Sequence, residues 1–253
     1  MVSAANQNHQ REKTMKFRVV TVAAALCVSS PCFATNDIDN LQSLVQTEFK
    51  SLSKDLGAAL SYKPVSPAEP LGLTGFDIGL EVTGTELKHS DLWDKASSGS
   101  APSTLLVPKL HLIKGLPLNF DVGVVYTKVP STNISLLGGE LRYAILEGGV
   151  ASPALAVRGT YTKLSGVDQL DFNTKGLELS ISKGFAMLTP YAGVGEEWVD
   201  SKPNASTGLS DESFQQTKYY LGANLNLGLM NFALEYDNTD SVNSYSAKLG
   251  WRF

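Results

Sequence analysis

From Gly72 to the C-terminus, apolar and polar residues alternate along the chain with a period of two. In the first run, Phe76, Ile78, Leu80 and Val82 are separated by polar or small residues. A period of two puts successive side chains on opposite faces of a β-strand. The pattern therefore predicts about ten strands, near residues 76–83, 106–112, 118–127, 140–145, 155–161, 177–182, 189–199, 219–227, 232–236 and 245–253.

The strand predicted near residues 189–199 is the least regular. Its alternation slips between Tyr191 and Trp198. A β-bulge inserts one extra residue into a strand and reverses the faces of the residues that follow. We therefore expect a bulge near Gly193 or Gly195.

Ahead of the strands, apolar residues recur at steps of three and four, which is one face of an α-helix. Pro64, Pro67 and Pro70 end this run and form a stiff, extended linker. We predict an amphipathic helix followed by a linker over residues 35–71. The apolar positions of the helix, at 38–60, are Ile38, Leu41, Val45, Phe49, Leu52, Leu56 and Ala59.

The N-terminal segment has the order of a secretory signal peptide. A cationic run at residues 15–18 precedes a short apolar stretch, and small residues lead to a cut after Ala34. We predict that residues 1–34 are an extension plus a signal peptide, with Met15 as a possible start. Both cysteines, Cys27 and Cys32, lie in this segment, so the mature chain has no disulfide.

The connections between the predicted strands alternate in length. Short turns at 115–117, 148–149, 184–188 and 228–230 alternate with longer polar connections at 88–103, 128–135, 163–174, 200–216 and 237–243. Short periplasmic turns and long outer loops are typical of outer-membrane barrels rather than of soluble sandwiches. An even strand number returns both barrel ends to the periplasmic side, where we expect the helix.

The aromatic residues fall into two groups on the predicted strands, as amphipathic rings do at the two interfaces of a membrane. Tracing the strands up and down places one group at the outer rim and the other at the inner rim. The outer group is Tyr126, Tyr161, Trp198, Tyr219, Tyr236 and Tyr245, and the inner group is Phe76, Phe120, Tyr143, Tyr191, Phe232, Trp251 and Phe253.

The last strand resembles the C-terminal signature of bacterial outer-membrane barrel proteins. These proteins end on an aromatic residue, usually Phe, preceded by alternating apolar positions. The resemblance covers about residues 73–253 and implies a transmembrane, antiparallel, up-and-down barrel placed by the barrel-assembly machinery. The residues that carry it are Tyr245, Leu249, Trp251 and Phe253.

The polar face of the strands is then the barrel interior. Its acidic and basic residues are nearly balanced in number, and the lumen of a small barrel is narrow. We favour a network that plugs the barrel, and a narrow pore lined by the same residues is the alternative. The predicted interior residues are Asp77, Glu81, Lys109, His111, Asp121, Glu140, Arg142, Arg158, Glu178, Glu235, Lys248 and Arg252.

For the predicted helix we considered three positions: on the inner leaflet, against the periplasmic mouth, and inside the barrel as a plug. Its polar face is mixed, with Lys50 and Lys54 beside Glu48 and Asp55. Helices that bind anionic lipid have a basic polar face. We therefore favour a periplasmic position or packing against the mouth.

Composition narrows the function classes further. The formal charge is −4 and the basic residues are scattered, which argues against a nucleic-acid partner. His89, Ser90 and Asp91 contain the residue types of a hydrolase triad, but consecutive residues seldom converge on one point. We predict no catalytic residue, no metal and no cofactor.

We therefore expect a monomeric, exported barrel of the bacterial outer membrane, in contact with its lipid. Its role would be structural, adhesive or that of a small-solute pore. The alternative is an outer-membrane enzyme that acts on lipid or peptide at the extracellular rim. The lipid A palmitoyltransferases also pair an N-terminal helix with a small barrel, but they have eight strands. The omptin proteases have about ten strands, but we find no motif that matches theirs.

Overall fold

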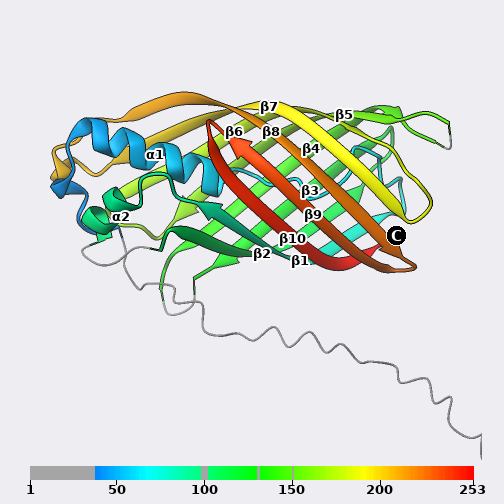
Figure 1. Cartoon of the computed structure of the whole chain (residues 1–253), viewed down its shortest axis with the longest axis horizontal. Coiled ribbons are helices and arrows are strands. Elements are labelled where there is room, and N and C mark those ends of the chain that lie inside the picture. Colours follow the sequence, from blue (N-terminus) through cyan, green and yellow to red (C-terminus); the bar gives the residue numbers. More distant parts are fainter. Residues whose placement is uncertain (1–37, 98–101, 130–131, 150) are drawn as a thin grey trace, which may run out of the picture. The chain divides into compact units, whose positions relative to one another are not determined.

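The computed structural model describes residues 38–97, 102–129, 132–149 and 151–253. Ten antiparallel strands form a closed barrel in which each strand pairs with its neighbours in sequence and β1 pairs with β10 (Figure 1). The strands are β1 Phe76–Glu86, β2 Thr104–Gly115, β3 Phe120–Lys128, β4 Ser135–Glu147, β5 Ala154–Ser165, β6 Leu170–Ser182, β7 Leu188–Pro203, β8 Glu212–Leu227, β9 Met230–Thr239 and β10 Val242–Arg252. The predicted fold class is confirmed.

The alternation in the sequence decides which face of each strand points outward. Outward positions such as Leu80 and Leu234 are exposed. The polar residues that alternate with the outward positions on each strand are buried in the barrel. Most strands extend beyond their predicted ends, for example β6, which starts at Leu170 rather than near 177, and β8, which starts at Glu212 rather than near 219. In these extensions the outward residues are polar, so the apolar marker disappears while the ladder of backbone hydrogen bonds continues. The long connections predicted at 163–174 and 237–243 are wrong, because the strands extend into them and leave only residues 166–169 and 240–241 as turns.

The expected bulge in β7 is absent, and Tyr191 does not belong to the inner-rim group. The register of β7 with β6 and with β8 is continuous, and Tyr191 is buried inside the barrel. Its ring lies over Gly222, where an added Cβ would be 2.3 Å from the ring. Because the alternation of β7 is unbroken, Tyr191 shares the inward face with Thr189 and Glu197, and Gly222 leaves room for its ring. The described bulge lies in β4, between Ala144 and Leu146.

The predicted N-terminal helix is divided. A short 3-10 helix, η1, spans Leu41–Ser43, and α1 spans Gln46–Leu60. Leu44 and Val45 between them are extended. The hydroxyl of Ser43 donates to the carbonyls of Asn40 and Lys95, and such local bonds compete with helix continuation. The expectation of one continuous helix over residues 38–60 is therefore wrong.

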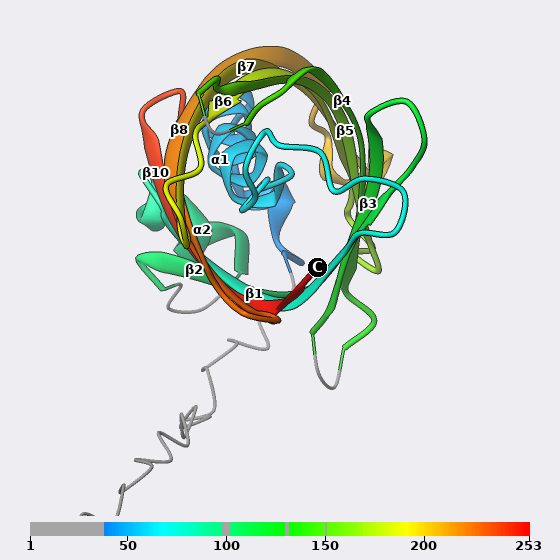
Figure 2. The same ribbon diagram turned by 90° about the vertical axis from the view of Figure 1, so that its right-hand side faces the viewer.

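The helix α1 lies within the ring of strands, as Figure 2 shows along the barrel. It occupies the end that carries the two longest connections, 87–103 and 204–211, which we call the long-connection end, and residues 61–71 continue through the interior to the start of β1 at the short-turn end. The expected periplasmic or mouth-packing position, at the short-turn end, is therefore wrong. The amphipathic pattern identified an apolar face but did not identify the surface that covers it.

An apolar core lies at the long-connection end. Phe49, Leu52 and Leu56 of α1 pack against inward side chains of the strands and against α2 (Ser90–Ser97). The other buried members include Leu41, Leu87, Trp93, Leu136, Leu164, Leu170, Phe172 and Val199. This core joins the N-terminal segment to the outer connections as one packed unit. Among the described residues, no helix is long and apolar enough to cross a membrane.

Candidate functional site

The predicted interior residues all point into the barrel. Except for Glu235, they form short chains of ion pairs, mostly between neighbouring strands. The pairs are Asp77 with Lys248 (2.8 Å) and Arg252 (3.2 Å), Glu81 with Lys109 (2.6 Å) and His111 (2.9 Å), Asp121 with Arg142 (2.8 Å), Arg158 with Glu140 (2.8 Å) and Glu178 (3.1 Å), and Glu178 with Lys218 (2.7 Å).

Such buried pairs are poor evidence of stability, because the cost of removing two charges from water offsets their attraction. Removing one partner is expensive, however, because the other charge stays buried and unpaired. The pairs therefore fix one arrangement of the interior. They also leave few charged groups there to act on a passing solute.

Several interior residues were missed by the sequence patterns. Lys218 and Asp237 lie on the inward parity of β8 and β9, just beyond the predicted strand ends, and extending the alternation would have found them. Glu197 was missed because the expected bulge made the face of β7 ambiguous. Lys63 comes from the linker, and no strand pattern predicts its position.

The linker contains three consecutive triplets with proline in the middle, at residues 63–65, 66–68 and 69–71. Each amide that follows a proline donates a hydrogen bond to a side chain of the barrel wall. Val65 donates to Glu235 (2.9 Å), Ala68 to Ser182 (3.1 Å) and Leu71 to Asp121 (3.0 Å). Proline has no N–H, so the three prolines remove three donors that would otherwise need partners in the interior.

Further contacts fix the rest of the linker. The Lys63 Nζ donates to Asp237 (2.8 Å) and to the carbonyl of Ala58 (2.8 Å). The Tyr62 hydroxyl lies 3.2 Å from His111 Nε2, and the Tyr62 carbonyl accepts from Lys218 (2.6 Å).

The guanidinium groups of the barrel wall also bind the linker. Arg142 donates to the carbonyl of Pro67 and to the Ser66 hydroxyl, which also accepts from Arg158. The ion-pair network and the linker therefore share the barrel interior.

Polar contacts hold α1 in the mouth of the barrel at the long-connection end. The Ser53 and Ser201 hydroxyls are 2.8 Å apart and buried. Towards the outer connections, Lys54 pairs with Asp240 (2.8 Å), and the Gln46 amide donates to Glu212 (2.7 Å). The helix is thus bound to β7, to the start of β8 and to the turn between β9 and β10.

One further pair links α1 to α2. Lys95 donates to Glu48 at 2.6 Å, and this bond lowers the pKa of the Glu48 carboxyl and raises the pKa of Lys95. Both side chains are partly exposed. The contact is therefore sensitive to pH and to salt.

The residues of the suspected triad at 89–91 do not act together. The His89 Nδ1 lies 3.1 Å from Asp55 of α1, and the other Asp55 oxygen accepts from the His89 amide at 2.8 Å. Asp55 is buried, and its contact with His89 fixes the start of α2 against α1. Because the Asp55 carboxylate binds both the backbone amide and the imidazole of His89, its role is to position this connection. Among the described side-chain hydrogen bonds, none joins a serine to the His89 imidazole.

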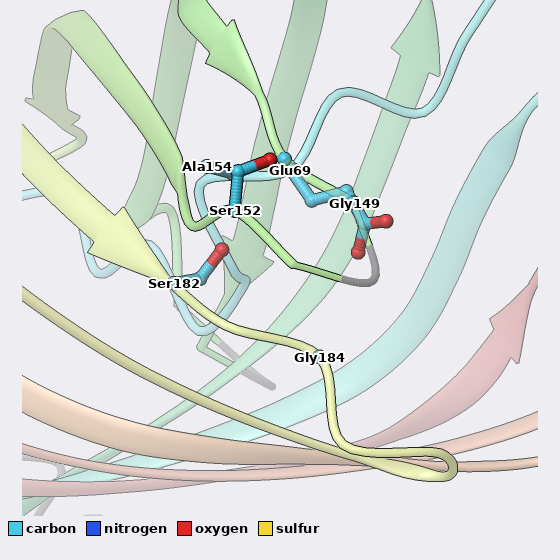
Figure 3. A pocket seen from close by; sticks show the side chains of 7 residues that line it. Glu69, Gly149, Ser152, Ala154, Ser182 and Gly184 are labelled. Atoms are coloured by element: carbon cyan, nitrogen blue, oxygen red, sulfur yellow. The ribbon is translucent and has the colours of Figure 1, made fainter.

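A cavity of about 290 Å³ lies at the short-turn end, lined by Glu69, Gly148, Gly149, Ser152, Ala154, Ser182 and Gly184 (Figure 3). Figure 3 shows the Glu69 side chain extending towards Gly149. Within the described part of the chain, no three His, Cys, Asp or Glu side chains gather as a metal site. The cavity offers one carboxylate and two hydroxyls, a set that indicates no particular ligand.

The C-terminal residues named by the resemblance lie along β10, from Tyr245 near its start to Phe253 just after its end. Tyr245, Leu249, Trp251 and Phe253 are exposed on the outer face. The backbone of Phe253 exchanges two hydrogen bonds with Phe76, at 2.8 and 3.0 Å, and so closes the seam between the first and last strands. Their role as an assembly signal stays a prediction. The signal peptide predicted at 1–34 lies outside the described residues.

Comparison with known proteins gives a likeness in fold. Two solved structures of Ail, the attachment invasion locus protein of Yersinia pestis, are similar, one of them in complex with the heparin analogue sucrose octasulfate. The identities are 15% and 12% and the TM-scores 0.28 and 0.22, and each match covers 71% of this chain and 97% of the Ail chain. No protein family and no curated protein matches the sequence.

Proposed function

We propose that this protein is an outer-membrane barrel with an occupied interior and a structural or adhesive role at the cell surface. The membrane location is supported by the outer face of the barrel. Every strand exposes large apolar side chains there, and a soluble monomer rarely exposes an apolar patch of more than a few hundred Å². Examples, one from each strand in the order β1 to β10, are Leu80, Leu110, Val122, Leu141, Tyr161, Leu177, Val194, Leu221, Leu234 and Leu249.

A closed barrel suits lipid because every strand is paired on both sides, so no backbone edge is left unsatisfied. The aromatic residues support the same placement. Tyr126, Tyr219 and Tyr245 are exposed towards the long connections, and Trp251 and Phe253 towards the short turns. We assign the long connections to the outside of the cell, as in outer-membrane barrels in general.

The single observation that carries the proposed role is the path of residues 46–71 through the interior. Side chains from β2, β3, β4, β5, β6, β8 and β9 bind residues 62–71. An open pore needs a continuous water-filled path, and here a stretch of the protein's own chain lies in that path. The proposal therefore favours a surface role over solute passage.

The outer end also suits a surface role. The connections rest on the apolar core that α1 and α2 share, and packed loops present a defined surface. The polar outward residues beyond the apolar band carry both charges, for example Lys175 beside Asp200 (3.4 Å). This mixture does not select an acidic or a basic partner.

Conductance in a planar bilayer tests the proposal. We expect the purified, folded barrel to give no stable stepwise conductance. A variant that lacks residues 35–71 should conduct, provided that heat-modifiable migration on gels shows it to be folded. Steady conductance of the full mature chain, at the level of the deletion variant, would contradict the proposal and favour the pore.

A further inference from the structure

The described chain starts at the end of the barrel that the proposed function places outside the cell. Ile38 is buried in the apolar core of the long-connection end. The amide of Asn40 donates to the carbonyl of Ala96 in the connection between β1 and β2 (2.9 Å). The amide of Leu41 donates to Gln169 in the connection between β5 and β6 (3.0 Å).

From there the chain runs inward. The Gln46 side chain at the start of α1 still binds the connection between β7 and β8, at Ser210 (3.0 Å). Tyr62 lies beside His111 in the interior, and the Leu71 amide binds Asp121 at the start of β3. β1 then starts at Phe76, beside the C-terminal Phe253. The chain thus passes through the barrel once before its first strand.

We infer that the barrel carries its own N-terminal segment through the outer membrane, so that α1 and residues 38–45 lie at the cell-surface end of the barrel. This inference rests on the proposed function for its assignment of inside and outside. It adds a second activity to the barrel, which is the translocation and presentation of an N-terminal segment.

The packing of the interior shows when this passage must occur. An α-helix with its side chains is about 10–12 Å across. The interior below α1 is filled by the ion-paired residues and the linker, and Arg142, Arg158 and Lys218 project into it. A helix does not pass such a constriction after closure. The strands therefore close around residues 61–71 while α1 is already on the outer side.

The charge pattern of the linker supports this order. Lys63 is the only lysine or arginine in residues 61–71, and its partner Asp237 belongs to β9, one of the last strands in the chain. Val65 binds Glu235 of the same strand. The last strands thus complete the binding site of the linker as they join the barrel.

Labelling of single cysteines on intact cells tests the inference. Thr47→Cys, exposed on α1, reports the N-terminal segment. Ser206→Cys reports the connection between β7 and β8, and Leu229→Cys the short turn between β8 and β9. The reagent is a maleimide on a polymer too large for outer-membrane pores. We expect the first two sites to react on intact cells, and Leu229→Cys to react only after the envelope is opened.

The outcomes separate the inference from the proposed function. If Ser206→Cys reacts on intact cells but Thr47→Cys reacts only in opened envelopes, the inference is wrong and the proposed orientation stands. If Ser206→Cys fails on intact cells although it reacts in opened envelopes, the proposed orientation fails and the inference fails with it. Gel migration of each variant shows that the barrel is folded.

A disulfide provides a second measurement that does not depend on surface access. The hydroxyls of Ser53 and Ser201 are 2.8 Å apart, so Ser53→Cys with Ser201→Cys brings two thiols together only if α1 lies in the outer mouth. We expect spontaneous oxidation in cells. Thr47→Cys with Ser201→Cys is the matched control, since Thr47 is exposed, and it should stay reduced. A reduced Ser53–Ser201 pair in a folded barrel would overturn the inference.

Discussion

Lys63 of the linker and Asp237 of β9 form an ion pair at 2.8 Å in which both side chains are fully buried. The two residues are 174 positions apart in the chain. The pair therefore joins the segment before the barrel to one of the last strands. It is one of several contacts that hold the linker in the barrel interior.

Replacing Lys63 by Met leaves the Asp237 carboxylate buried beside an apolar chain of similar length. We expect a loss of about 3–5 kcal/mol in the free energy of unfolding, the usual cost of removing one partner of a buried pair. Urea unfolding in liposomes measures it. The matched control is Lys54→Met, which breaks the exposed pair with Asp240 and should cost at most about 1 kcal/mol. Equal losses would mean that the linker is not held in the interior.

Gly193 of β7 faces Tyr220 of β8, and an added Cβ would lie 2.3 Å from the tyrosine ring. Gly193→Ala should therefore destabilise the barrel by about 1–3 kcal/mol through overpacking. In a Tyr220→Ala background the same substitution should cost much less, which a double-mutant cycle in urea would show. Gly159→Ala is the control because nothing lies within 4 Å of its added Cβ. Additive losses would contradict the predicted contact.

The bond between Glu48 and Lys95 makes the contact of α1 with α2 dependent on pH. Because the pKa of Glu48 is lowered from its ordinary 4.5 in the folded state, the bond stabilises the contact above pH 4.5. This contribution is lost as the pH falls through the lowered pKa. We expect the protection of residues 90–97 against hydrogen exchange, measured relative to the intrinsic exchange rate at each pH, to fall in acid. In Glu48→Gln this protection should already be low at neutral pH, and any remaining acid dependence of the protection should be small. An unchanged acid dependence in that variant would exclude Glu48 as the cause.

Deleting Phe253, or replacing it by Asp, should lower the yield of folded barrel in cells far more than it lowers the stability of the barrel that forms. The reason is its position at the seam and the resemblance of the last strand to an assembly signal. Heat-modifiable migration on gels compares cell envelopes with protein refolded into liposomes. Phe232→Asp, on the same outward face of the neighbouring strand, is the control for loss of an aromatic ring. A normal yield in cells without Phe253 would leave it as one more interfacial aromatic residue.

The sequence alone determined the strand number, the faces of most strands and the charged composition of the interior. Alternation is a local property: once a strand forms, its period of two decides which side chains share a face. Glu81, Arg158 and Lys248 were therefore predictable as interior residues. Their partners were predictable only in kind.

Tertiary structure decided the rest. The ring of Tyr191 fits inside the barrel because the facing residue on the neighbouring strand is Gly222. The buried position of Lys63 depends on its partner Asp237. The amphipathic pattern of α1 states that Phe49 and Leu52 need cover, but covers of similar polarity exist on a membrane, at a barrel mouth and inside it. Only the closed barrel supplies the apolar surface, with Leu164 and Phe172, that decides among them. Because the chain must reach β1 at the opposite end, this choice also decides that residues 61–71 fill the interior.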